Sequence, residues 1–217
     1  MSEGAPQSVT PIPEAEPEVA FATEIEPLTD QQGLEYFAVP VNSALIQPHL
    51  KFLKERLGER FDAATTAKGD RDGVGKYHLT VVKPPELKAF TDEQKENAAY
   101  WEWRRAKIYE YMRDPAHSMA VRVDVHGVRK IEGKEEKGEG GRTAYFAVVS
   151  SDDIEGLRTD LDEYLRIRTV EYNAARKEGE PEFAHVPLEP ISAHITLGFE
   201  GGDVHRSGAK DLTADPV

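Results

Sequence analysis

Two short apolar segments that share one internal pattern constrain this 217-residue chain more than any other feature. They cover residues 77–83 and 192–199, with the sequences YHLTVVK and SAHITLGF. Both are rich in β-branched and apolar residues, which is typical of buried strands. Because side chains alternate between the two faces of a strand, His78 and Thr80 share one face, and so do His194 and Thr196. We expect the two strands to lie side by side, so that both His-x-Thr faces line one groove.

The same alternation predicts what else each strand presents. In the second segment it places Gly198 on the face of the His-x-Thr motif and Phe199 on the core-facing side. In the first segment it places Lys83 on the face opposite His78. Lys83 could therefore neutralise a phosphate only if the strand ends or twists there, and a solvated lysine is the competing interpretation.

The rest of the chain is predicted to alternate strands and helices in a repeated order. The predicted elements are a strand at 35–41, a helix from 43 or 48 to 58, a loop at 62–75, the first His-x-Thr strand, a helix at 92–112, a hairpin of two strands between 119 and 149, a helix that begins at 152, a loop at 179–190 and the second His-x-Thr strand. Each His-x-Thr strand thus closes a small α+β unit. We expect an α+β fold of two pseudo-symmetric lobes, each an antiparallel sheet with outer helices, and a central groove where the motifs meet.

The N-terminal segment differs from the rest in composition. Residues 1–35 hold eight acidic residues and no Lys or Arg, which accounts for −8 of the net charge of −13 and leaves −5 for residues 36–217. Residues 1–30 also contain five prolines. We therefore expect an acidic, Pro-rich disordered tail at 1–30 and one domain at 31–217. Such a tail could recruit a protein partner.

Charge and hydropathy limit the partners and the compartment. Neither part of the chain has the basic surface that is needed to grip long duplex nucleic acid, whereas a small nucleotide or a single RNA end needs only a few cations. No apolar run approaches a membrane span, and the N-terminus lacks the regions of a signal peptide. The sequence contains no Cys, which excludes disulfides and a Cys nucleophile. We expect a cytoplasmic monomer that binds no membrane.

The paired imidazoles and hydroxyls suit phosphodiester chemistry. Histidine titrates near neutral pH, so one of a pair can accept a proton while the other donates one. Hydrolysis of a cyclic phosphate needs a base for the attacking water and an acid for the departing ribose oxygen. The hydroxyls of Thr80 and Thr196 can donate hydrogen bonds to the non-bridging oxygens, so the chemistry requires no metal or cofactor. The competing interpretation is that both histidines are core or edge residues satisfied by backbone groups.

The two motifs, HLTV and HITL, resemble the paired His-x-Thr/Ser-x signatures of the 2H phosphoesterase superfamily. This family comprises bilobal α+β proteins, among them RNA 2′,3′-cyclic phosphodiesterases and the bacterial 2′-5′ RNA ligase-like enzymes. The resemblance implies a 2H phosphoesterase-like fold. It also implies that His78 and His194 are the catalytic residues and that Thr80 and Thr196 bind the phosphate.

Further residues could contact a substrate, each with a structural alternative. The second motif HITLGF, at 194–199, is followed by DVH at 203–205 and KD at 210–211, and this stretch is similar to the cyclic phosphodiesterase module of RNA-repair and tRNA-ligase systems. Tyrosines near the motifs could stack on a base and cations could bind phosphate, while packing or solvation is the alternative for each. These candidates are Tyr36, Lys83, Arg122, Tyr145, His205 and Lys210.

Several other catalytic motifs do not occur in the sequence. It has no His-x-x-x-His or His-Glu-x-x-His spacing for zinc, no Gly-x-x-x-x-Gly-Lys phosphate loop and no Gly-x-Ser-x-Gly elbow. We predict a metal-independent phosphodiesterase that opens 2′,3′-cyclic phosphates of RNA ends or nucleotides, in RNA repair or processing. Two alternatives stay open: the same chemistry on 2′-5′-linked or cyclic oligonucleotides or ADP-ribose cyclic phosphate, and a non-catalytic nucleotide-binding or adaptor module.

Overall fold

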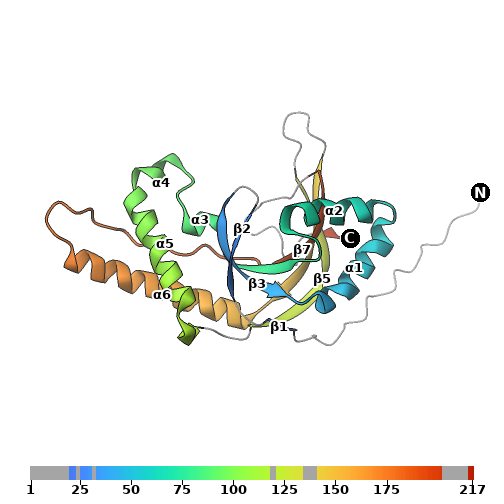
Figure 1. Cartoon of the computed structure of the whole chain (residues 1–217), viewed down its shortest axis with the longest axis horizontal. Helices are drawn as coiled ribbons and strands as arrows, with labels where there is room; N and C mark the ends of the chain where they lie inside the picture. Colours follow the sequence, from blue (N-terminus) through green and yellow to red (C-terminus); the bar gives the residue numbers. More distant parts are fainter. Residues whose placement is uncertain (1–19, 23–24, 31–32, 118–120, 134–140, 202–214) are drawn as a thin grey trace, which may run out of the picture.

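The structure of the chain, a computed structural model, describes residues 20–22, 25–30, 33–117, 121–133, 141–201 and 215–217. Most of the predicted tail lies outside these residues, as do His205 and Lys210. The described chain forms two antiparallel sheets with covering helices (Figure 1), which confirms the predicted α+β class and its two-sheet architecture.

The strands form two antiparallel sheets, and the two His-x-Thr segments belong to different sheets. The first sheet has the order β2-β3-β4, and the second has the order β1-β5-β6-β7, with the short β8 also paired to β5. The strands are β1 Ala20–Ala22, β2 Glu26–Thr29, β3 Glu35–Val41, β4 Tyr77–Val82, β5 Val121–Gly133, β6 Arg142–Ser150, β7 His194–Glu200 and β8 Asp215–Pro216. The motif strands β4 and β7 each stand at one end of their sheet's order, and they contact one another. They are neighbours, as predicted, although they pair with different strands.

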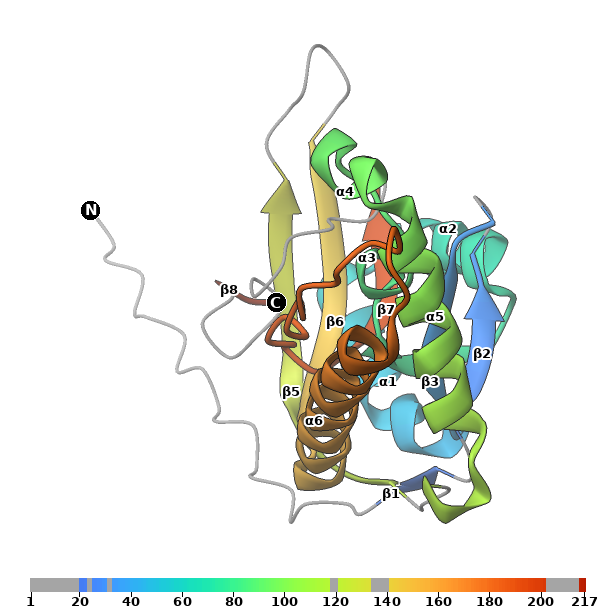
Figure 2. The ribbon, with the colours of Figure 1, turned by 90° about the vertical axis from the view of Figure 1, so that its left-hand side faces the viewer.

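Helices cover the sheets at two ends. Figures 1 and 2 show α1 and α2 at one end and α4, α5 and α6 at the other. The helices are α1 Ser43–Leu57, α2 Arg60–Asp72, α3 Pro84–Leu87, α4 Asp92–Glu96, α5 Ala98–Arg113, the 3-10 turn Pro115–His117 and α6 Asp152–Ala175. Helix α1 begins after Asn42, whose side chain accepts a hydrogen bond from the Ala44 N–H at 2.9 Å. It ends at Gly58, which has a φ of 57° that favours glycine.

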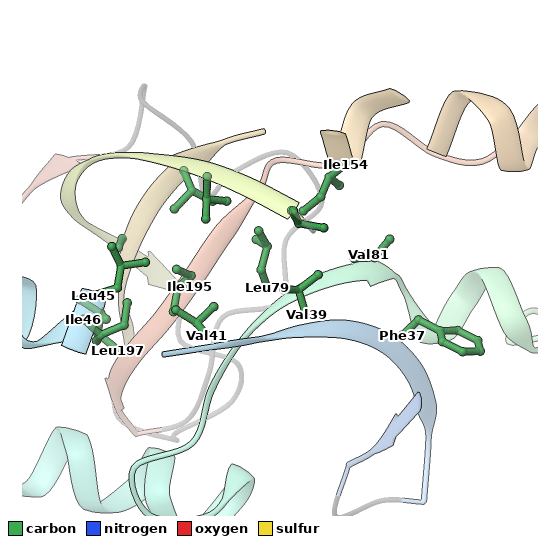
Figure 3. Close-up of a cluster of buried hydrophobic side chains, with 14 of the residues drawn as sticks. Phe37, Val39, Val41, Leu45, Ile46, Leu79, Val81, Ile154, Ile195 and Leu197 are labelled. Atoms are coloured by element: carbon green, nitrogen blue, oxygen red, sulfur yellow. The ribbon is translucent and has the colours of Figure 1, made fainter. Parts of the chain in front are cut away.

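One hydrophobic core joins the two sheets behind the motif strands (Figure 3). Leu79 and Val81 of β4 and Ile195 and Leu197 of β7 belong to the same buried cluster, and each is at most 1% exposed. Burial of one such side chain stabilises the fold by roughly 1.5–3 kcal/mol. The apolar residues that directly follow each His and each Thr of the motifs therefore hold β4 against β7.

Two predicted elements between the motifs were wrong. Residues 62–75 were expected to form a loop, but most of them belong to α2, which buries Ala64 and Lys68. The predicted helix at 92–112 is broken at Asn97 into α4 and α5, because Asn97 has a non-helical backbone with φ −114° and ψ 45°. The capping box at Thr91 and Gln94 exists, but it starts the shorter helix α4.

The predicted boundary of the domain at residue 31 was also too late. Strand β2 pairs with β3 through Glu26–Thr29, and Ile25 packs against the main core. Strand β1 pairs with β5. Strands therefore form within the segment that composition assigned to the tail, because pairing partners elsewhere in the chain override its acidic and Pro-rich composition.

None of the helices in the described part of the chain combines the length and the apolar character that crossing a membrane requires.

Candidate active site

The first motif strand departs from regular pairing directly after its threonine. Thr80 pairs with Ala38 and Val82 pairs with Phe37, so Val81 is an extra residue in β4 at this register shift. A strand that carries one extra residue bulges locally, and its alternation changes phase beyond that point. Val82 therefore shares the core side with Phe37, and both are almost fully buried.

The second motif strand departs from regular pairing at the equivalent position. Thr196 pairs with Phe146 and Gly198 pairs with Tyr145, so Leu197 is the extra residue in β7. Because Tyr145 and Phe146 are neighbours on opposite faces of β6, Gly198 lies on the face opposite Thr196. The prediction that Gly198 shares the face of the motif is thus wrong, and the bulge is the reason.

The side chain of Phe199 was predicted to face the core, but it lies on the opposite face of the sheet. It belongs to a small cluster with Ala144, Ala67 and Ile131, which is separate from the main core that holds Ile195. Simple alternation cannot foresee this, because the extra residue is set by the pairing with β6. The two motifs nevertheless match: in both, the residue after the threonine is the one without a partner in the register.

The imidazole of His78 lies beside an aromatic ring and near a charged cluster. The ring centroids of Tyr36 and His78 are 5.3 Å apart, and His78 is half-buried. Burial, together with the nearby carboxylate of Asp72, raises the pKa of Tyr36 to about 12. The Tyr36 phenol is therefore protonated at neutral pH, so its hydroxyl can donate a hydrogen bond. The structure brings together Tyr36 and His78, two residues that the sequence had singled out.

The charged cluster is formed by the last turn of α2, which the sequence analysis had taken for a loop. Asp72 accepts hydrogen bonds from Arg71 at 2.6 and 2.8 Å and lies 3.4 Å from the amine of Lys68. Burial alone would raise the pKa of Asp72, but Arg71, Lys68 and His78 together bring it below its usual value. The guanidinium of Arg71 also lies over the ring of Phe199, at 4.8 Å from its centroid. The cluster therefore reaches both His78 beside β3 and the strand β7.

The imidazole of His194 is oriented by the backbone that precedes β7. Its Nδ1 lies 2.8 Å from the carbonyl oxygen of Ser192. A carbonyl can only accept a hydrogen bond, so Nδ1 carries the proton of the neutral ring. The ring also meets the edge of Phe146, with centroids 5.9 Å apart. Next to it, the Val149 N–H donates to the carbonyl of Ala193 at 3.1 Å, which attaches the start of β7 to β6.

The two motif threonines and Lys83 are the remaining predicted site residues near the motif strands. Thr80 is half-buried and Thr196 is 9% exposed. Strand β4 ends at Val82, and the amine of Lys83 donates to the carbonyl of Pro190 at 3.0 Å and lies 3.5 Å from Glu189. Lys83 is therefore held by the loop that leads to the second motif and is not simply solvated.

Two other predicted substrate contacts, Tyr145 and Arg122, do not join the motif side chains. Tyr145 is 2% exposed and belongs to the main core, on the face opposite Thr196, and its hydroxyl donates to Glu200 at 3.0 Å. Of the two interpretations of Tyr145, core packing is therefore the one that the structure bears out, because the phase of β6 turns its ring inward. Arg122 is exposed and pairs with β1 beyond the end of the β5–β6 ladder, so it does not lie beside either motif strand.

Sequence reasoning missed one further cation on the motif face of the second sheet. Arg129 pairs with Phe146, which in turn pairs with Thr196, so the three residues share one face. Its guanidinium is half-buried and bonds the carbonyl of Val128 at 3.3 Å. Alternation alone could not find Arg129, because β5 also has a register shift, between Val125 and Gly127. The shift reverses which residues of β5 face the motif side of the sheet.

The surface cavities near the helices lie apart from the motif side chains. Two surface cavities, of about 960 and 640 Å³, lie between α1 and α2 and beside α3 and α5, and neither is lined by the histidines or threonines of the motifs. The predicted central groove is thus not one of these cavities. Among the residues that the structure describes, no group of three or more His, Cys, Asp or Glu could hold a metal ion.

One comparison with known proteins gives a match. The family described as "Swiss Army Knife, 2H phosphoesterase domain" (2H-SAK) matches residues 41–205, which is most of the chain and includes both motifs. No curated protein and no solved structure matches the chain. The family supports a phosphodiesterase-type function and places the protein among the phosphoesterases. With two His-x-Thr strands of matching geometry in contact, the chain belongs to the 2H phosphoesterase family.

Proposed function

We propose that the protein hydrolyses 2′,3′-cyclic phosphates of RNA ends or nucleotides without a metal, by acid–base catalysis with His78 and His194. The observation that carries this proposal is the matching of the two motif strands. Both place His and Thr two residues apart, both shift register at the next residue, and the strands touch. Two such strands offer two imidazoles and two hydroxyls to one phosphate.

The chemistry of the ring nitrogens supports this reaction. The Nδ1–H of His194 donates to a carbonyl, so in the neutral ring Nε2 is the nitrogen with the lone pair that can accept a proton from water, and the protonated ring can return one to a leaving oxygen. The hydroxyls of Thr80 and Thr196 can donate hydrogen bonds to the non-bridging oxygens, where negative charge grows in the transition state. The phenol of Tyr36, protonated beside His78, is a third donor on the same side.

Charge supports a small substrate or a single RNA end. The chain carries a net charge of −13, which opposes binding along many phosphates. The cations near the motifs are few, and the described ones include Arg71, Lys83 and Arg129, all of which already contact protein groups. Such a site suits one phosphodiester better than an extended strand.

The test is turnover of nucleoside 2′,3′-cyclic monophosphates in the presence of EDTA. We expect a bell-shaped pH dependence of kcat, and a loss of about 10²–10⁴-fold in kcat for His78→Ala and for His194→Ala. His117→Ala is the matched control, because this imidazole stacks on Tyr111, with ring centroids 3.8 Å apart, and belongs to neither motif. Activity that persists in the double variant of both motif histidines would contradict the proposal.

The substrate panel decides between related reactions. It includes 2′-5′-linked oligonucleotides, cyclic oligonucleotides and ADP-ribose cyclic phosphate, with analysis of the position of the product phosphate. Turnover of one of these compounds alone would keep the acid–base mechanism and replace the substrate. Tight binding of a nucleotide without any turnover would instead identify a binding module.

A further inference from the structure

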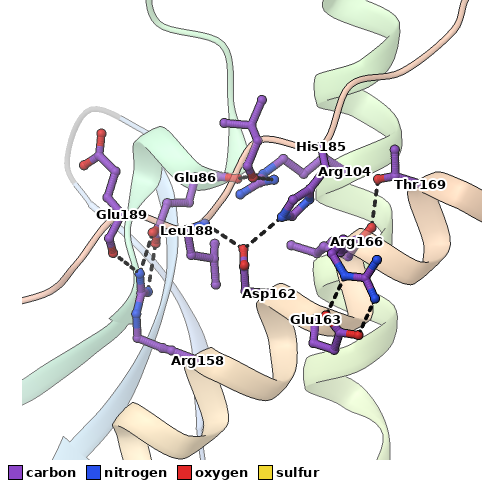
Figure 4. A network of polar contacts seen from close by, with 12 residues as sticks. Glu86, Arg104, Arg158, Asp162, Glu163, Arg166, Thr169, His185, Leu188 and Glu189 are labelled. Carbon is purple, nitrogen blue, oxygen red and sulfur yellow. Dashed lines mark hydrogen bonds and ion pairs between the residues drawn. The ribbon is translucent and has the colours of Figure 1, made fainter.

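A buried ion pair connects the segments that carry the two motifs (Figure 4). Arg158 of α6 donates to Glu86 of α3, with Nη2 to Oε1 at 2.7 Å and Nη1 to Oε2 at 3.1 Å. The side chains are 6% and 4% exposed. Glu86 also accepts a hydrogen bond from the N–H of Lys83 at 2.8 Å, directly after the first motif strand. The carboxylate therefore fixes the orientation of the guanidinium relative to the end of β4.

The remaining hydrogen bonds of Arg158 go to two backbone carbonyls, one from each motif-bearing segment. Nη1 donates to the carbonyl of Val81, and Nη2 donates to the carbonyl of Glu189. Val81 is the extra residue of β4, directly after Thr80, and Glu189 lies five positions before His194 in the loop that leads into β7. One planar guanidinium thus binds the backbone on both sides of the site.

The loop before β7 is held along its whole approach to the second motif. The Val186 N–H donates to the hydroxyl of Tyr100 at 2.9 Å, and the Leu188 N–H donates to Asp162 at 2.8 Å. The carbonyl of Pro190 accepts from Lys83 at 3.0 Å. This loop has no regular secondary structure, so side chains from α5, α6 and the end of β4 determine its path. Like Arg158, Lys83 connects the end of the first motif strand to the loop before β7.

Stability alone is a weak explanation for the buried pair. Removing two charges from water is costly, and well-packed apolar residues of similar volume are often as stable as a buried ion pair. What apolar residues cannot supply is a rigid planar donor that fixes two carbonyls at a set spacing. The pair therefore provides geometry that hydrophobic packing would not.

We propose that Arg158 is a positioning residue that sets the spacing of the two His-x-Thr motifs, by binding the carbonyl of Val81 and the carbonyl of Glu189. The inference rests on the proposed function, in which the two imidazoles must act on one phosphorus atom. In such a reaction a misplacement of about 1 Å can lower the rate by about 10²-fold.

The first test compares Arg158→Lys with Arg104→Lys in the full chain. Lysine keeps the charge of Arg158 but lacks the planar fork that reaches two carbonyls. Arg104 is 1% exposed and belongs to the same network, where it binds the carbonyls of Glu86 and Val186, but it contacts no residue of either motif strand through these bonds. We expect kcat to fall by about 10²-fold with KM little changed in Arg158→Lys, and kcat to stay near wild type in Arg104→Lys. Equal kcat losses in the two variants would overturn the proposal.

The second test separates positioning from stability. The double variant Arg158→Met with Glu86→Leu leaves no unpaired buried charge, so its thermal unfolding should recover relative to Arg158→Met alone. We expect kcat to remain low in the double variant, because the two carbonyls are still unheld. Recovery of kcat together with stability would show that Arg158 acts only on folding, and would overturn the proposal.

A third measurement does not depend on turnover. The Hε1 resonances of His78 and His194 in NMR spectra should shift in Arg158→Lys and stay in place in Arg104→Lys. If the wild-type protein turns over no cyclic phosphate, the proposed function fails, but these resonances still report whether Arg158 positions the motifs. Unchanged resonances in Arg158→Lys would overturn the positioning role even in an active enzyme.

Discussion

The carboxylate of Asp72 shows how one residue connects the end of α2 to the first motif. It accepts two hydrogen bonds from Arg71, and its charge acts on both Tyr36 and His78. Its neighbour Lys68 donates to the carbonyl of Lys76, and burial lowers the pKa of the Lys68 amine. Asp72 is thus held in a cluster with two cations, Arg71 and Lys68, beside the first motif.

We expect Asp72→Asn to reveal this cluster through the pH dependence of stability. The pKa of Asp72 is lowered in the folded state, so its contribution is present above the unfolded value of 3.8 and is lost as the pH falls through the folded value. At neutral pH the variant should be less stable than wild type by about 1.5–3 kcal/mol, the range for hydrogen bonds to charged groups. Urea unfolding across the pH range measures the difference. A difference that does not shrink in acid would contradict the assignment.

At the residue scale, the repeated spacing of His78 and His194 inside apolar strands predicted that these strands are neighbours, and the contact of β4 with β7 confirms it. Prediction failed where the pairing of strands decides which face a side chain occupies. The inward orientation of Tyr145 could not be predicted, because six consecutive residues of β6 are buried and no alternation of polar and apolar residues indicates the face. The face of Gly198 depends on the bulge, which is a property of two strands and not of one sequence segment.

Helix α2 shows the same limit at the scale of elements. Its buried side chains are only Ala64 and Lys68, so no apolar stripe announces a helix in this polar segment. The helix is nevertheless held closely against β7, because Gly198 faces its backbone. A Cβ at Gly198 would lie 3.0 Å from the carbonyl oxygen of Ala64. The charged cluster at the end of α2 thus reaches the site because the strand has no side chain at that point.

Gly198→Ala should therefore move α2 or the strand. We expect a loss of stability of about 1–3 kcal/mol, as for overpacking of a close contact, and a lower kcat because Arg71 and Asp72 move with the helix. Gly156→Ala in α6 is the matched control, since a Cβ there meets nothing within 4 Å, and it should gain about 0.5–1 kcal/mol. Thermal unfolding and kcat measure both variants. Equal stability of the two variants would contradict the close approach of α2.

At the scale of the whole molecule, the two-lobed architecture was predictable from the order of the elements and the duplicated motif. The exact start of the fold was not, because β1 and β2 consist of short segments inside an acidic, Pro-rich composition. Strand β2 gains its place by pairing with β3 in the sheet of the first motif. The end of β2 is connected to the start of β3 by Asp30, whose side chain accepts a hydrogen bond from the Leu34 N–H at 2.8 Å.

Truncation of the N-terminal segment tests whether β1 and β2 contribute to the stability of the fold. Removal of residues 1–19 takes away no described strand, so we expect the melting temperature and kcat to stay near those of the full chain. Removal of residues 1–30 deletes β1 and β2 and should lower the melting temperature by on the order of 5–10 °C, which corresponds to a loss of about 2–3 kcal/mol for a chain of this size. Equal melting temperatures for the two truncated chains would show that the strands contribute nothing.

The matching bulges after Thr80 and Thr196 also bear on how this chain avoids misfolding. A strand in a regular ladder can slip by one residue and expose its apolar side chains to water. A bulge at a defined position fixes the register, because only one alignment of the two strands accommodates the extra residue. Slipped pairings of β4 with β3 and of β7 with β6 are thereby disfavoured during folding. The refolded chain should therefore carry both motif histidines on the face opposite the core.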